Sequence, residues 1–300
     1  MKYLSLIRFP NLVLIALVQI SLRYGFILPK IGIAGLNDFQ FLLLVLATVF
    51  IAAAGYIIND IYDVEADKIN KPKRQIIGKS ISENTGFNLY LALNIVGVGC
   101  GFFVSNAIDR PGFVALFIIL SASLYLYANT LKRMIVISNL LIAGLVAMSL
   151  IVVAIFDLLP LVTPENKEDF FPYLKMTGLY ALFAFSINFI REIVKDIQDI
   201  NGDKKQNINT LPISLGRKRT VIIVFVLTLL LTFGIMRFLY LNLYTEPKKM
   251  LYFLFGIVGP LLYFCIKAWD AKKQKDYRIL SSILKFVMFT GICSLWLFRF

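Results

Sequence analysis

The 300-residue sequence contains no histidine, only three cysteines and two tryptophans, and only 16% of its residues are charged. The absence of histidine excludes Ser-His hydrolases, zinc or haem bound through histidine, and a histidine general base. Cys100, Cys265 and Cys293 lie far apart in apolar segments, so we expect small buried side chains rather than a disulfide or a zinc site. The chemistry must come from carboxylates, cations, amides, hydroxyls and a metal ion.

Hydrophobic residues are abundant, at 59% of the chain, and the mean hydropathy is +0.77. These values are typical of a polytopic membrane protein. Nine apolar runs approach the length of about 20 residues that a membrane-spanning helix needs. They cover residues 12–28, 39–58, 88–105, 112–127, 135–158, 173–190, 220–240, 250–267 and 279–297. No polar stretch is long enough to build a soluble core, so we predict one all-α membrane domain over residues 1–300, a bundle of about nine transmembrane helices.

The formal net charge of +13 is better explained by membrane topology than by binding to nucleic acid. The loops after the second, fourth, sixth and eighth runs are rich in lysine and arginine, whereas the intervening loops are neutral or acidic. The positive-inside rule therefore predicts an integral membrane protein with a cytoplasmic N-terminus and a C-terminus outside. In a bacterium this would be the inner, or cell, membrane. Both acidic clusters described below then fall on the cytoplasmic side.

An acidic cluster stands at the end of the second apolar run and comprises Asn59, Asp60, Asp63, Glu65 and Asp67. On a helix, the i, i+4, i+8 spacing of Asn59, Asp63 and Asp67 places these side chains along one face. Carboxylates gathered there would repel one another near a bilayer unless a cation neutralised them. An all-oxygen site suits Mg²⁺, which keeps several waters and takes up phosphate oxygens. The Asn59 carbonyl would add a neutral ligand.

A second cluster with 3/4 spacing ends the sixth apolar run and comprises Glu192, Asp196, Asp199 and Asp203. One such cluster alone is equally well interpreted as a solvated helix end with i,i+4 ion pairs. Two clusters at equivalent places in a membrane chain favour a function, because acidic residues in membrane helices are functional by default. We interpret the clusters as two metal-binding walls that hold Mg²⁺ ions bridging a diphosphate.

Cations accompany both clusters. Lys71, Lys73 and Arg74 follow the first cluster, and Arg191 and Lys195 lie within the second. The positive-inside rule alone explains most of these lysines. Arg74, Arg191 and Lys195 stand close enough to the acids to favour binding of the substrate.

A third group lies at the cytoplasmic end of the fourth run and comprises Tyr125, Tyr127, Asn129, Lys132 and Arg133. Tyrosines at such a boundary usually belong to an interfacial belt, whereas Lys132 and Arg133 place cations on the same side as the acids. Arg8 and Asn11 open the first run on that side, where Arg8 is either a headgroup anchor or a substrate ligand.

Over essentially its whole length, the sequence resembles the UbiA superfamily of intramembrane prenyltransferases. The resemblance rests on N-D-x-x-D-x-x-x-D before a basic stretch, on nine apolar runs, and on a later D-x-x-D-x-x-x-D. It implies an all-helical bundle with a Mg²⁺-bound prenyl diphosphate in a central cavity that opens to the bilayer. The R-x-P-N pattern at Arg8 to Asn11 and the segment from Tyr125 to Lys132 also resemble family segments.

With this resemblance, we assign roles to the motif positions. The expected Mg²⁺ ligands are Asn59, Asp63, Asp67, Asp196, Asp199 and Asp203. The expected catalytic residues are Asp63, Asp67, Asp199, Asp203 and Lys132. The expected substrate-binding residues are Arg8, Asn11, Arg74, Tyr125, Lys132, Arg133, Arg191 and Lys195.

Three segments look most like the geranylgeranylglyceryl phosphate geranylgeranyltransferase branch of the family, which forms an ether bond in isoprenoid lipid synthesis. They are D-K-I-N-K-P-K-R at 67–74, R-E-x-x-K-D at 191–196, and N-T-L-P at 209–212. One departure is R-Q-I-I-G-K at 74–79, where the branch often has R-P-I-P-S-G. The lost prolines affect a loop that would touch the acceptor, but not the metal motifs.

The resemblance implies that Mg²⁺ and cations neutralise the departing diphosphate, and that the acceptor attacks an allylic cation in a dry cavity. The favoured acceptor is geranylgeranylglyceryl phosphate, with Lys132, Arg133 and Arg74 as ligands of its phosphate. The alternative acceptor is aromatic: 4-hydroxybenzoate, a naphthoate or a haem precursor. An alternative of another class is a cation-coupled transporter, but acids at one edge of the membrane rather than at its midplane argue against it.

Overall fold

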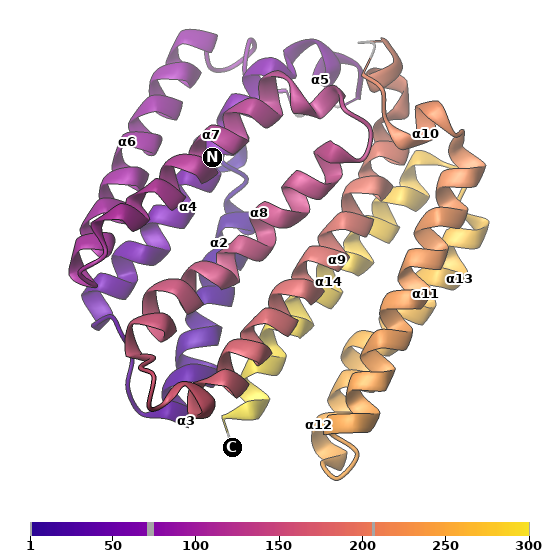
Figure 1. The fold of residues 1–300 in the computed structure, drawn as a ribbon. Coiled ribbons are helices and arrows are strands. Elements are labelled where there is room, and N and C mark those ends of the chain that lie inside the picture. The colour runs from indigo at the N-terminus through magenta and orange to yellow at the C-terminus, as the bar shows by residue number, and fades with distance from the viewer. Residues whose placement is uncertain (1, 71–74, 206–207, 300) are drawn as a thin grey trace.

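The computed structural model describes residues 2–70, 75–205 and 208–299, whose long helices run side by side from one end of the molecule to the other (Figure 1). In these residues, nine helical segments are long and apolar enough to cross a membrane. They are Phe9–Ile31, Asp38–Tyr62, Glu83–Ala107, Pro111–Asn129, Ile137–Leu161, Lys167–Lys205, Arg217–Asn242, Pro247–Asp270 and Gln274–Phe298. Each contains one predicted span, except that the fifth begins at Ile137 rather than at residue 135. The prediction of an all-α bundle is confirmed.

Several of these segments consist of more than one helix. The first half of the chain contains α1 (Lys2–Leu6), α2 (Phe9–Ile20), η1 (Ser21–Ile27), α3 (Leu28–Ile31), α4 (Asp38–Tyr62), α5 (Val64–Asn70), α6 (Glu83–Ala107), η2 (Pro111–Phe113), α7 (Val114–Asn129) and η3 (Leu131–Arg133). The second half contains α8 (Ile137–Val153), η4 (Ala154–Leu158), η5 (Leu159–Leu161), α9 (Lys167–Lys205), α10 (Leu211–Ser214), α11 (Arg217–Asn242), α12 (Pro247–Phe253), η6 (Leu254–Val258), α13 (Gly259–Asp270), α14 (Gln274–Ser294) and η7 (Leu295–Phe298).

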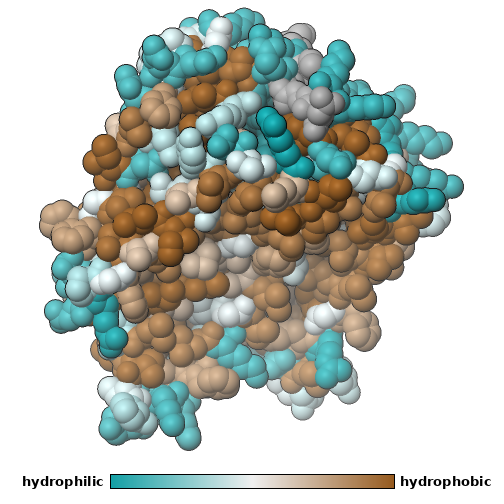
Figure 2. Space-filling model, turned by 45° about the horizontal axis from the view of Figure 1, so that its top comes forward, coloured by the Kyte–Doolittle hydropathy of each residue, from teal (hydrophilic) through white to brown (hydrophobic). Residues whose placement is uncertain are grey.

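The surface of the molecule is divided between a polar end and an apolar band. Figure 2 shows polar side chains gathered over the end that carries α5 and α10, with hydrophobic side chains below them. In the spans, Phe103, Phe233 and Phe255 are 67%, 70% and 78% exposed. Aromatic side chains exposed to this extent are costly in water but match the hydrocarbon of a bilayer. The protein is therefore an integral membrane protein.

Small residues let the helices of the first half approach closely. A Cβ atom at Gly101 of α6 would lie 2.4 Å from the ring of Phe117 in α7, and one at Gly97 would lie 2.9 Å from Ile51 in α4. In membranes, where apolar burial between helices gains little over lipid, such close packing holds helices together. It fixes α4, which carries the first acidic motif, against its neighbours.

The two acidic motifs lie on different kinds of backbone. The second motif lies within the continuous helix α9, as predicted. The first motif does not lie on one helix, because α4 ends at Tyr62 and α5 begins at Val64, with Asp63 as the cap between them. The ladder of hydrogen bonds still continues, since Asp63 N donates to Asn59 O at 3.0 Å and Asp67 N to Asp63 O at 2.8 Å. Helix α5 packs against α9, which brings the two motifs together.

At the other end of the bundle, near the label C in Figure 1, two π-helical turns carry a buried ion pair. Arg23 in η1 donates to both oxygens of Asp157 in η4, at 2.9 and 3.1 Å, and the two side chains are 3% and 0% exposed. Arg23 also donates to Leu36 O at 2.7 Å and to Asp38 at 3.2 Å. Leu36 N donates to Asp157 at 3.0 Å. The network ties the connection before α4 to α2 and α8.

Candidate active site

Lys132 is the point where the two acidic motifs meet. It lies in η3, after α7, and forms an ion pair with both carboxylate oxygens of Asp63 from the first motif. It also lines a small cavity of about 30 Å³ together with Asp196 and Asp203 of the second motif. The predicted convergence of the motifs is therefore present among the described residues.

The wall formed by the first motif is organised by amide and guanidinium groups. Asn59 donates to Asp63 at 2.8 Å, and Arg8 donates to Asp60 at 2.8 Å. Arg8 adopts a left-handed backbone conformation with φ 51°, a strained geometry for a non-glycine residue that is typical of functional sites. Burial would lower the pKa of Arg8, but the Asp60 carboxylate holds that pKa above its ordinary value, so the guanidinium stays charged.

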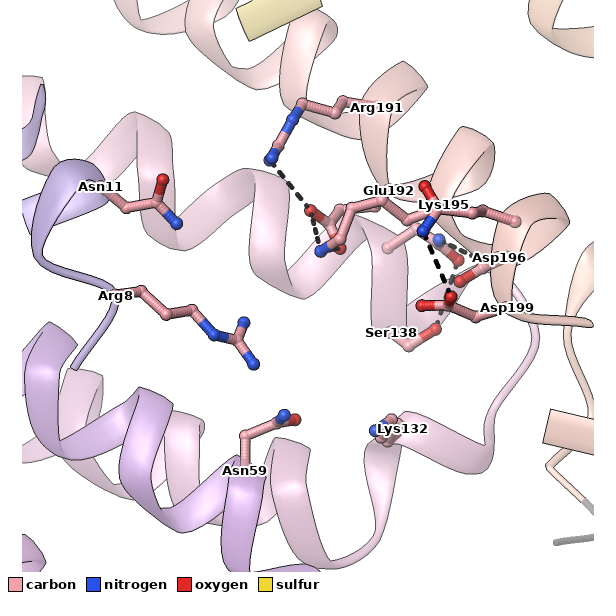
Figure 3. A network of polar contacts seen from close by, with 12 residues as sticks. Arg8, Asn11, Asn59, Lys132, Ser138, Arg191, Glu192, Lys195, Asp196 and Asp199 are labelled. Atoms are coloured by element: carbon pink, nitrogen blue, oxygen red, sulfur yellow. Dashed lines mark hydrogen bonds and ion pairs between the residues drawn. The ribbon is translucent and has the colours of Figure 1, made fainter. Parts of the chain in front are cut away.

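The opposite wall is α9. Glu192 accepts hydrogen bonds from Lys195 at 2.8 and 2.9 Å and lies 3.7 Å from Arg191. Asp196 accepts a hydrogen bond from Asn139 of α8 at 2.8 Å. Figure 3 shows Arg8 and Asn59 on one side of a common space and the α9 side chains on the other, with Asp199 beside Lys195 and Asp196. The predicted α9 residues thus lie together.

Of the polar residues that line the cavity, Ser138, Asn139 and Thr210 were not predicted as ligands from the sequence, and Tyr127 was named only as a member of the third group. Tyr127, Ser138, Asn139 and Thr210 line the cavity with Glu192, Asp196 and Asp203. Ser138 and Asn139 form a polar pair at the start of the fifth apolar run, a signal that the sequence did contain. Thr210 is 6% exposed, and its Oγ1 has no hydrogen-bond partner among the described residues.

Of the predicted substrate ligands that the structure describes, Lys132 lines the cavity and the others do not. The Tyr125 hydroxyl accepts a hydrogen bond from Tyr62 at 3.3 Å, and its ring packs against Tyr62 and Tyr90, between α4 and α6. Arg133 is exposed, although it follows Lys132 directly. Arg74 lies outside the described residues, as do Lys71 and Lys73. Their roles stay predictions.

A second polar group faces the same space from α2, α9 and α14. Lys285 of α14 donates to Asn11 of α2 at 2.9 Å, and Asn11 donates to Tyr56 at 3.3 Å. Helix α14 packs against α9, which carries Arg191. Asn11 and Arg191 were predicted from the sequence, whereas Lys285, an isolated cation within an apolar run, was not.

The donor set suits a divalent cation with oxygen ligands. The cavity lining includes three carboxylates, Glu192, Asp196 and Asp203, against one cation, Lys132, and the unpartnered Thr210 hydroxyl adds another oxygen. No three Asp, Glu, Cys or His side chains of the described chain lie close enough to hold a metal as they stand. Instead, Lys132 pairs with Asp63, Lys195 pairs with Glu192, and Asn139 donates to Asp196. Carboxylate and hydroxyl oxygens are the hard donors that Mg²⁺ prefers.

Comparison with known proteins identifies the family. The pattern of the UbiA prenyltransferase family matches residues 26–290. This chain belongs to the UbiA prenyltransferase family. The predicted family and the predicted class of enzyme, a membrane prenyltransferase, are confirmed.

UbiA relatives with a named activity extend over most of the chain. This chain is 33% identical over 270 residues to the digeranylgeranylglyceryl phosphate synthase of Korarchaeum cryptofilum. The aligned region covers 87% of this chain and 86% of the relative. The chain is 34% identical over 232 residues to the synthase of the same name from Saccharolobus solfataricus, with 77% and 74% covered. These names agree with the branch that the motifs predicted.

Solved UbiA structures share the fold. A structure of a digeranylgeranylglyceryl phosphate synthase superposes with a TM-score of 0.61 at 23% identity, covering 99% of this chain and 97% of the other. A UbiA homologue from Archaeoglobus fulgidus, bound to GPP and Mg²⁺, superposes with a TM-score of 0.60 at 16% identity, covering 98% and 99%. At these identities the likeness concerns the arrangement of the helices.

Proposed function

We propose that this chain transfers the prenyl group of a prenyl diphosphate to the free hydroxyl of a geranylgeranylglyceryl phosphate and so forms an ether. The observation that carries the proposal is the meeting of both acidic motifs at Lys132, which pairs with Asp63 and shares a cavity with Asp196 and Asp203. The names of the relatives from Korarchaeum and Saccharolobus support this acceptor. The geometry alone fits any UbiA acceptor.

Mg²⁺ would be held by Asp63 and Asp67 with Asn59 on one wall, and by Asp196, Asp199 and Asp203 on the other. The homologue from Archaeoglobus fulgidus, whose structure holds GPP and Mg²⁺, supports this requirement. When bound, the metal neutralises the charge that develops on the departing diphosphate. Lys132 lies between the walls, where its ammonium group stabilises that same charge.

In the proposed reaction, the bond between C1 of the prenyl group and the diphosphate oxygen breaks, and the electron pair leaves with the diphosphate. The oxygen of the acceptor hydroxyl forms the new bond to C1 and gives up its proton to a carboxylate or to the diphosphate. An allylic cation must be shielded from water, and a bundle embedded in lipid excludes water from its interior. The aromatic side chains of the spans shield such a cation further.

We place this site on the cytoplasmic side, with the N-terminus inside and the C-terminus outside. The support is the distribution of charge, since the loops at the end with α5 and α10 are the basic ones. A test replaces the three cysteines and introduces Lys79→Cys or Lys167→Cys. In intact cells, a membrane-impermeant maleimide should label the cysteine at 167 and leave that at 79 unlabelled until lysis; the reverse pattern would invert the topology.

Purified protein in detergent tests the activity itself. It is incubated with Mg²⁺, geranylgeranyl diphosphate and either geranylgeranylglyceryl phosphate or 4-hydroxybenzoate, and diphosphate release and product mass are measured. We expect an ether product that requires Mg²⁺. A prenylated aromatic ring instead would keep the family chemistry and overturn the acceptor, whereas folded protein that releases no diphosphate with either acceptor would overturn the proposal. Ion-dependent flux without diphosphate release would support the transporter alternative.

A further inference from the structure

Lys285 is a cation placed deep within the last membrane span. It lies eleven residues beyond Gln274, the first residue of α14, which corresponds to roughly 16 Å along the helix axis. An ammonium group at such a depth is costly, and residues of this kind mark substrate or ion sites by default. Its hydrogen bond at 2.9 Å is to the neutral amide oxygen of Asn11, which leaves its charge to be balanced by something else.

The surroundings of Lys285 are positively charged. Helix α14 packs against α9, which carries Arg191 and Lys195, and Figure 3 shows Arg8 and Arg191 around the same space as Asn11, the partner of Lys285. Among the described residues, the carboxylates bonded to these four cations are Asp60, which pairs with Arg8, and Glu192, which Lys195 and Arg191 share. Arg191 Nε is also buried without a hydrogen-bond partner in the described chain. In the part of the chain that the structure describes, no carboxylate is bonded to Lys285, so Lys285 and the Arg191 Nε can both take up an anion.

This basic group and the acid-lined cavity face one space from opposite sides. In Figure 3, Asn11 and Arg191 lie on one side, away from Asp199, Ser138 and Lys132. The acid-lined cavity suits an anion that arrives with Mg²⁺, as a diphosphate does. The basic group suits an anion that binds directly to cations, without a metal.

We propose that Lys285, with Arg191 and Asn11, binds the phosphate monoester of the lipid acceptor. The proposal rests on the proposed function, since it assigns the second anion of that reaction. In a glyceryl phosphate, the free hydroxyl and the phosphate are attached to neighbouring carbons, so a phosphate held beside the acid-lined cavity places the hydroxyl near the reacting carbon. The carboxylates of the acid-lined cavity repel a phosphate that arrives without a metal. The donor diphosphate and the acceptor phosphate therefore bind at different places.

Steady-state kinetics with Lys285→Gln tests this assignment, with each substrate varied at saturation of the other. We expect KM for geranylgeranylglyceryl phosphate to rise at least about tenfold, because one charged hydrogen bond is lost. KM for geranylgeranyl diphosphate should change less than about twofold, and Lys285→Arg should restore much of the acceptor affinity. With geranylgeranylglycerol, which lacks the phosphate, wild type and Lys285→Gln should have equal kcat/KM. Lys275→Gln, an exposed lysine of the same helix, is the matched control.

Binding measured without turnover gives a second reading. In EDTA and without the diphosphate, geranylgeranylglyceryl phosphate should raise the melting temperature of the wild type and of Lys275→Gln but not of Lys285→Gln. If Lys285→Gln does not fold, Arg191→Gln serves as the independent variant with the same expectation. An equal rise in KM for the diphosphate would assign the cations to the donor, and an unchanged acceptor KM would leave Lys285 a structural role; either result overturns the proposal. Failure of the wild type to make the ether would instead overturn the proposed function.

Discussion

Charged side chains are buried at both ends of the bundle, but they are balanced differently. At the end that carries α3, Arg23 and Asp157 pair with each other and both are also bonded to the backbone of Leu36, although Arg23 Nε has no hydrogen-bond partner among the described residues. At the pocket end, three carboxylates share a cavity with one lysine, and Thr210 Oγ1 has no partner in the described chain. A charge within a membrane helix therefore does not by itself indicate a ligand site. Carboxylates that line one cavity together with a cation do.

Removing one partner of the balanced network should have the largest effect, and the effect should be on stability. Asp157→Asn leaves Arg23 with the exposed Asp38 carboxylate, at 3.2 Å, in place of its buried counter-charge, and breaking such a buried pair costs about 3–5 kcal/mol of folding free energy. We expect a lower melting temperature in detergent, while the protein that remains folded keeps its KM for both substrates. An unchanged melting temperature, or a change confined to KM, would contradict a purely structural role for the Arg23–Asp157 pair.

Removing a carboxylate of the unbalanced network should act on turnover. Asp63→Asn and Asp196→Asn are nearly isosteric and should each lower kcat by about 10²–10³-fold, the usual loss when one group that stabilises developing charge is removed. The melting temperature of Asp196→Asn should not fall, because fewer like charges then share the cavity, whereas that of Asp63→Asn should fall slightly, because it loses its part-buried ion pair with Lys132. Variants that melt early and keep their specific activity would show that these carboxylates are structural.

Mg²⁺ should stabilise the folded protein through the acid-lined cavity and not through the Arg23–Asp157 network. With a non-hydrolysable prenyl diphosphate analogue present, Mg²⁺ at 100 times its dissociation constant adds about 2.7 kcal/mol to the stability of the folded state. We expect a higher melting temperature for the wild type and for Asp157→Asn, reversed by EDTA, and no change for Asp63→Asn. A metal shift that survives Asp63→Asn would place the metal elsewhere.

The smallest effect concerns two neighbouring tyrosines of α7. Tyr127→Phe changes the lining of the cavity, whereas Tyr125→Phe removes one hydrogen bond with Tyr62. A single hydrogen bond contributes about 0.5–1.5 kcal/mol. We expect Tyr127→Phe to alter kcat/KM several-fold and Tyr125→Phe to leave it within about twofold. Equal losses of kcat/KM in both variants would show that lining the cavity does not distinguish Tyr127 from Tyr125 in catalysis.

Hydropathy and charge were sufficient to predict much of the fold. Each predicted span lies within an observed helical segment apart from the start of the fifth, because every spanning helix must satisfy its backbone within an apolar run. The length of α9 was underestimated, because its last turns, from Arg191 to Lys205, are polar and extend beyond the apolar run. The break at Asp63 was missed, because the regular spacing of the first motif is equally compatible with one continuous helix.

The site was predictable where a motif repeated and not where a single residue acts through a tertiary contact. Asp63 and Asp196 follow from spacing. Asn139 becomes a site residue only because α8 packs beside α9 and brings its amide within 2.8 Å of Asp196. Thr210 reaches the cavity through the short connection after α9, which has no periodic signal. Lys285 was predictable in principle, since an isolated cation in an apolar run is itself informative.

The most direct test of the account compares wild type, Asp63→Asn and Asp157→Asn in one assay. The ether formed from geranylgeranyl diphosphate and geranylgeranylglyceryl phosphate in the presence of Mg²⁺ is measured by mass and divided by the amount of folded protein. The account predicts equal specific activity for wild type and Asp157→Asn and a loss of at least about a hundredfold for Asp63→Asn. Folded Asp63→Asn that makes the ether at the wild-type rate, or an equal loss in both variants, would contradict it.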